Sequence, residues 1–99
     1  MGKTATVDRL VSQDERNDGV SSAFWRGEAV LVSLSEPCEG ASRLWVSESN
    51  CPFGGWETFA FEADAAGSVW EWNPLEISQT GVASWRTVLE DAGYEVVER

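Results

Sequence analysis

The chain has 99 residues, with seven basic and seventeen acidic side chains, a formal net charge of -10 and no histidine. This length holds one domain, and a 42% hydrophobic share with 11% aromatic residues is too high for a disordered chain. Without histidine, and with only two cysteines, a Cys/His zinc site or a Ser-His or Cys-His nucleophile pair cannot be built. The negative charge opposes direct binding to nucleic-acid phosphates.

The N-terminal residues carry no apolar signal-peptide core, and no apolar run reaches the roughly 18 residues that a membrane span needs. We therefore expect a protein of a reducing cytoplasm without a membrane partner. In that reducing compartment Cys38 and Cys51 are expected to be thiols, but their even number leaves a disulfide open.

The composition of the chain changes near residue 22. Residues 1–21 predict a loosely packed N-terminal arm, within which residues 6–11 have the spacing of a short helical turn. Residues 22–99 predict a single α+β domain.

Four strands are predicted in the first part of this domain. Residues 28–35 form a short, β-branched apolar run, and residues 43–48 follow as its hairpin partner. Residues 56–63 and 68–77 are the third and fourth strands, and Pro74 makes the end of the fourth irregular because proline cannot donate to a ladder.

The connection at residues 64–67 is typical of a type I turn that ends in a left-handed glycine. That turn sets the register of a hairpin in which Phe61 lies opposite Trp70 and Phe59 lies opposite Trp72. Both aromatic pairs then share one apolar face, and the other face is polar and solvated.

The remaining residues predict a helix and a closing strand. Thr80 is the expected helix cap, and apolar positions at helical spacing run from Val82 to Ala92. Gly93 ends the helix, and residues 94–97 form a short strand. The predicted fold is an antiparallel sheet of four to five strands with one C-terminal helix packed on its apolar face.

Acidic residues are spread along the predicted strands and create a negative field over the sheet. Glu57, Glu62 and Glu71 are the candidates for charge contacts with a partner. The alternative is that the acidic surface serves solubility or adaptation to high salt.

Aromatic residues provide a second candidate feature. Trp45 and Trp56 are candidate anchors, in a patch that would include Trp25 and Phe53, because exposed tryptophans concentrate binding energy at interfaces. Stacking on sugar rings is an alternative use of such a patch. We interpret three other tryptophans as residues that pack in the core, namely Trp70, Trp72 and Trp85.

Catalytic and metal sites are not supported by the sequence. Glu62 and Glu71 could lie a strand apart, at the spacing of the two carboxylates of a glycosidase. The sequence places no other functional group beside them, so we interpret them as part of a solvated face. No loop has the order of a calcium-binding loop. We expect no enzyme activity, no cofactor and no metal.

The C-terminal half resembles a group of small orphan proteins encoded by actinobacterial phages. The resemblance lies in the block E-T-x-x-F-x-A-D-x-x-G-x-V-x-x-W, which begins at Glu57 and ends at Trp72, and in the ending A-G-Y-E-V at residues 92–96. Residues 1–50 show no such resemblance. The resemblance implies a phage or prophage origin. It implies no activity and no catalytic residue for this chain.

Two functional hypotheses follow. In the first, the chain is an acidic binding protein that inhibits a host nucleic-acid-handling defence protein by occupying its basic site, as anti-CRISPR proteins and other DNA mimics do. In the second, it is a structural or accessory phage protein that acts by oligomerisation, for example as a homodimer, or in virion assembly.

Overall fold

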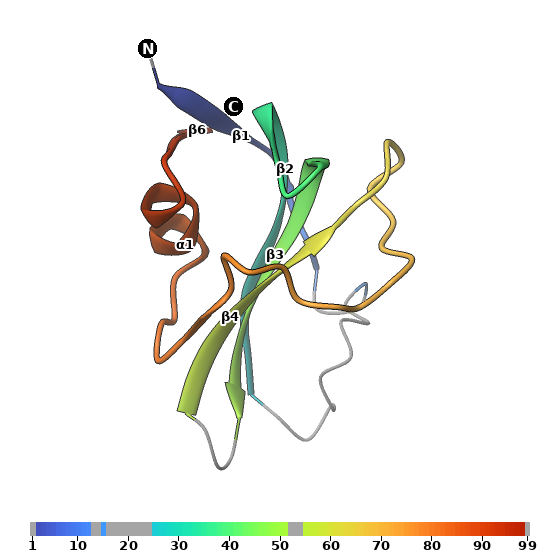
Figure 1. Ribbon diagram of the computed structural model, residues 1–99. Coiled ribbons are helices and arrows are strands. Elements are labelled where there is room, and N and C mark those ends of the chain that lie inside the picture. The colour runs from blue at the N-terminus through green and yellow to red at the C-terminus, as the bar shows by residue number, and fades with distance from the viewer. Residues whose placement is uncertain (1, 13–14, 16–24, 52–54, 99) are drawn as a thin grey trace.

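The computed structural model describes residues 2–12, 15, 25–51 and 55–98 and shows an α+β fold, as the sequence predicts (Figure 1). A single sheet has the strand order β5-β4-β3-β2-β1-β6. Its elements are, in chain order, β1 (Lys3–Leu10), β2 (Trp25–Cys38), β3 (Ala41–Cys51), β4 (Gly55–Glu62), β5 (Gln79–Thr80), α1 (Trp85–Asp91) and β6 (Tyr94–Glu98).

The first strand corrects two predictions. Lys3–Leu10 is not part of a loose arm with a helical turn, because it forms β1 between β2 and β6, with Ala5 and Val7 buried. The sheet is also mixed and six-stranded instead of antiparallel with four to five strands, because β1 and β6 are parallel. The parallel partner of β1, β6, lies at the other end of the chain, so a local pattern did not reveal this pairing. Residues 13–14 and 16–21 of the predicted arm lie outside the described residues.

The three central strands confirm the predicted strands at 28–35, 43–48 and 56–63. They pair antiparallel, with Val32 opposite Leu44 and Val46 opposite Ala60. Residues 29–32 are all buried, which explains why β2 has a continuous apolar run instead of an alternating one.

Both faces of the sheet are covered (Figure 1). Helix α1 packs on one face through Trp85 and Leu89, against side chains such as Leu44. The irregular segment 63–73 covers the opposite face, where Phe61 is buried. The prediction that the helix covers the aromatic face is therefore wrong. Successive side chains of β4 point to opposite faces, and the helix packs on the face of Ala60.

The predicted fourth strand is also wrong. Its turn forms, but residues 68–77 do not pair as a strand with β4. Leu75 N–H donates to the Ala60 carbonyl at 2.8 Å, Ala60 N–H donates to the Ser78 hydroxyl at 2.9 Å, and β5 then pairs with β4. These contacts occupy the edge of β4 along which residues 68–77 would have to pair in the predicted hairpin.

Helix α1 is shorter than predicted and begins after Ser84 instead of Thr80. The Ser84 hydroxyl accepts a hydrogen bond from Thr87 N–H at 3.1 Å, as an N-cap does. Gly93, at φ +95°, follows the helix as predicted, and β6 confirms the closing strand. Among the described residues, no helix has the length and apolarity that crossing a bilayer requires.

Trp72 is the centre of an aromatic cluster on the face opposite α1. Its ring makes edge-on contacts with Phe61, at a centroid distance of 5.0 Å, and with Trp45, at 5.5 Å. Trp70, two residues earlier, is 82% exposed. The two tryptophans that were both expected in the core therefore have different environments.

We expect Trp72→Ala to lower the free energy of unfolding by about 2–4 kcal/mol, because it leaves a cavity between two rings. Trp70→Ala should lower it by no more than about 1 kcal/mol, because the exposed ring leaves no cavity and only its hydrogen bond to Asp64 is lost. Urea denaturation of both variants measures the difference. Equal destabilisation would support the aromatic hairpin that the structure does not contain.

Candidate protein-binding surface

The three acidic candidates do not lie together. Glu62 and Glu71 line one hollow, so the structure brings these two residues to the same place. Glu57 lies five residues before Glu62 on β4, about 17 Å away, with its side chain on the opposite face of the sheet. It is half-buried and interacts with neighbouring residues. Glu57 therefore does not belong to the surface that contains Glu62.

Neither aromatic candidate is an exposed anchor. Trp45 is only 6% exposed and packs in the core, so it was wrongly predicted. Trp56 is half-buried beside Gly27, about 20 Å along β4 from Glu62. Phe53 and the side chain of Trp25 lie outside the described residues. Among the described side chains, Trp70 is the exposed tryptophan, and the sequence did not reveal this because the predicted hairpin register assigned it to the core.

Asp64 fixes the segment that carries Trp70. One carboxylate oxygen accepts hydrogen bonds from the N–H groups of Ala66 and Ser68, both at 2.9 Å. The other accepts from the indole N–H of Trp70 at 2.7 Å. The bonds from Ser68 N–H and from the Trp70 indole hold the pKa of Asp64 below its usual range. Gly67, at φ +85°, completes the turn with an N–H bond to the Asp64 carbonyl, as predicted.

The hollow beside Trp70 has a volume of about 440 Å³. It contains three carboxylates and, among the described residues that line it, no lysine or arginine. The lining residues are Glu62, Ala63, Asp64, Trp70, Glu71, Asn73 and Leu75. We call this set the Trp70 surface.

Most acidic side chains elsewhere in the described residues have a partner, whereas Glu62 and Glu71 have none. The described carboxylates without a hydrogen-bond or ion-pair partner are those of Glu36, Glu62, Glu71, Glu76, Glu90 and Glu95. Arg43 borders an adjacent hollow with Glu62, but its guanidinium contacts Asp8 at 3.1 Å and the Ala65 carbonyl at 2.8 Å. The Trp70 surface therefore presents two uncompensated charges beside an exposed ring.

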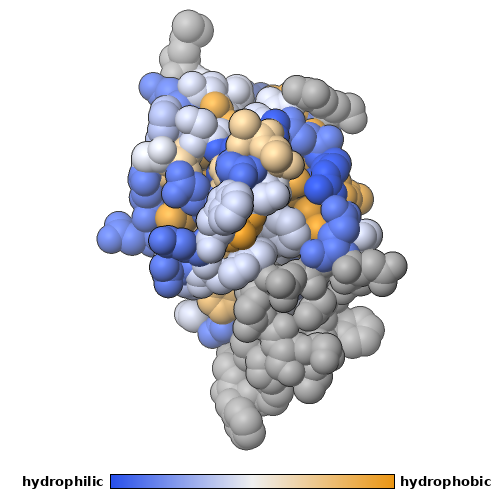
Figure 2. All heavy atoms as spheres, turned by 90° about the vertical axis from the view of Figure 1, so that its right-hand side faces the viewer, coloured by the Kyte–Doolittle hydropathy of each residue, from blue (hydrophilic) through white to orange (hydrophobic). Residues whose placement is uncertain are grey.

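Figure 2 views the molecule from the side of the segment 63–75. Pale and hydrophobic side chains lie in the middle of this face, with hydrophilic side chains on both sides of them. A hydrophobic centre with a polar rim is the usual layout of a protein-binding surface.

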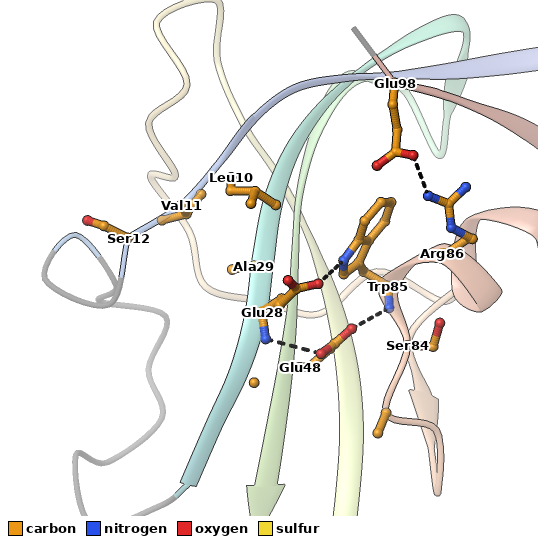
Figure 3. Close-up of a pocket in the computed structure, with 12 residues that line it drawn as sticks. Leu10, Val11, Ser12, Glu28, Ala29, Glu48, Ser84, Trp85, Arg86 and Glu98 are labelled. Atoms are coloured by element: carbon orange, nitrogen blue, oxygen red, sulfur yellow. Dashed lines mark hydrogen bonds and ion pairs between the residues drawn. The ribbon is translucent and has the colours of Figure 1, made fainter.

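A second and larger hollow, of about 980 Å³, lies at the beginning of α1 (Figure 3). Its carboxylates hold the helix on the sheet. Glu48 accepts hydrogen bonds from Glu28 N–H at 3.1 Å and Trp85 N–H at 2.9 Å, and Glu28 accepts from the Trp85 indole at 3.1 Å. Arg86 pairs with Glu98 at 2.9 Å. Because these charged groups already have partners, we assign them a structural role.

Among the described residues, no three Asp, Glu or Cys side chains are placed to hold a metal ion. Cys38 is a free, buried thiol. Burial, and then the charge of Glu39, raises the pKa of this thiol, which keeps it protonated at neutral pH. Nucleophilic chemistry at Cys38 is therefore not favoured.

Comparisons of the chain with known protein families, with characterised proteins and with solved structures found no match.

We expect the contribution of Asp64 to stability to depend on pH. Its pKa is lower in the folded state, so the stabilisation is present above the unfolded pKa of about 4 and is lost as the pH falls through the folded value. Urea denaturation of the wild type and Asp64→Asn should therefore show a stability difference that shrinks from pH 6 to pH 3. A difference that is constant over this range would contradict the assigned role of the carboxylate.

Proposed function

We propose that this chain is an acidic binding protein of phage or prophage origin, which inhibits a host nucleic-acid-handling protein by occupying its basic site. The observation that carries the proposal is the Trp70 surface. There Glu62 and Glu71, which have no partner among the described residues, line the same hollow as a tryptophan that is 82% exposed. Such a surface offers charge to a basic groove and an aromatic anchor to its apolar parts.

Electrostatics supports this choice of partner. A net charge of -10 attracts a basic groove over a long range and accelerates association. The same charge repels nucleic acid itself, so the chain and the nucleic acid compete for the groove. Binding should consequently weaken as salt is added.

A structural phage protein that acts by oligomerisation is the second candidate. The edge strand β6 favours it, because Val97 on this strand is 40% exposed. Glu95 on the same strand, whose carboxylate has no partner among the described residues, opposes pairing with a second, equally acidic copy. We therefore favour the inhibitor.

The proposal is tested by capturing a partner with the tagged chain from nuclease-treated bacterial lysate over a series of salt concentrations. The captured protein is then purified, and its binding to labelled DNA is measured as the chain is added. We expect the chain to displace the DNA, and Glu62→Lys with Glu71→Lys to weaken displacement by about tenfold or more, with little loss of stability.

The matched control is Glu90→Lys with Glu95→Lys. Each pair of substitutions changes the net charge from -10 to -6, because each Glu→Lys adds two charges. The control residues lie on α1 and β6, on other parts of the fold. Equal weakening by both pairs would remove the Trp70 surface from the interface. No displacement of DNA, together with a mass that rises with concentration, would favour the structural phage protein.

A further inference from the structure

Trp70 is held in place although it is exposed. Its indole N–H donates to Asp64 at 2.7 Å, and Asp64 is itself fixed by two backbone N–H groups. Among the described residues, no other aromatic ring stacks on Trp70. An exposed ring in a fixed orientation loses little conformational entropy when a partner covers it.

The charges beside the ring favour a cation. Glu62 and Glu71 are exposed, line the same hollow as the ring and have no partner among the described residues. The face of an indole attracts a cation placed over it, and nearby carboxylates add charge-assisted hydrogen bonds. Both features point to the same chemical class of ligand.

We propose that the Trp70 surface receives an arginine side chain of a basic protein partner, with the guanidinium stacked on the Trp70 ring and hydrogen-bonded to Glu62 or Glu71. This inference rests on the proposed function and specifies which group of the partner is recognised. Arginine fits better than lysine, because its planar guanidinium stacks on an aromatic face and binds a carboxylate with two parallel hydrogen bonds.

A nuclear magnetic resonance titration tests the arginine site without the unidentified partner. The probes are the peptides acetyl-Gly-Arg-Arg-Gly-amide and acetyl-Gly-Lys-Lys-Gly-amide, which carry equal charge. The indole N–H resonance of Trp70 is assigned through Trp70→Phe. We expect this resonance to shift with the arginine peptide, which should bind about two- to fivefold more tightly than the lysine peptide.

Substitutions separate stacking from charge. Trp70→Ala should lower the affinity of the chain for the arginine peptide by about two- to fivefold. Trp70→Phe keeps an aromatic face and should retain most of this affinity. Glu62→Gln with Glu71→Gln should lower the affinity for both peptides. The control, Glu90→Gln with Glu95→Gln, should lower it less. Equal affinities for both peptides, or shifts confined to other residues, would overturn the arginine site.

The arginine site and the inhibitory function can be wrong independently of each other, and the two experiments distinguish these cases. If Trp70→Ala displaces DNA as well as the wild type does, the arginine site is wrong and the inhibitory function stands. If the arginine peptide binds at Trp70 but the chain displaces no DNA from its captured partner, the arginine site stands and the inhibitory function is wrong.

Discussion

Residues 63–84 contain only the two-residue strand β5, so most of their backbone N–H groups have no partner in the sheet. Backbone N–H groups without a partner in the sheet need another acceptor, and here carboxylates accept several of them. Asp64 accepts from the turn that follows it, and Glu39 accepts from the N–H groups of residues 76 and 77, at 3.0 and 3.3 Å. Glu48 accepts from the first residue of α1. These bonds hold the segment that covers one face of the sheet and the helix that covers the other.

The acidic side chains of the described residues therefore fall into two groups. One group, which includes Glu39, Glu48 and Asp64, hydrogen-bonds to the protein itself and stabilises irregular backbone. The other group has no partner, and two of its members, Glu62 and Glu71, lie beside exposed Trp70. A net charge alone does not distinguish these groups, because each carboxylate contributes equally to it. The geometry distinguishes them, and the functional proposal depends on the second group.

The sequence predicts the α+β class, the three central strands, the Asp64 turn and the closing strand, because short apolar runs and turn residues determine these locally. It does not predict β1, whose pairing with β6 joins opposite ends of the chain. It also assigns Trp70 to the core, because the turn at Asp64 suits an aromatic hairpin as well as the observed loop. Pro74 indicated only an irregular end of that strand, because it cannot donate to a ladder and lies beyond both aromatic pairs. Of the five candidate residues, the structure places Glu62 and Glu71 in one exposed surface.

The central claim is that the Trp70 surface is the face that binds the partner. Amide hydrogen exchange of the chain, alone and in complex with the DNA-binding protein that it captures, tests this claim most directly. We expect the complex to slow exchange at residues 62–73 and to leave exchange in α1 and β6 unchanged. Slower exchange at residues 85–98, with no change at residues 62–73, would contradict the account.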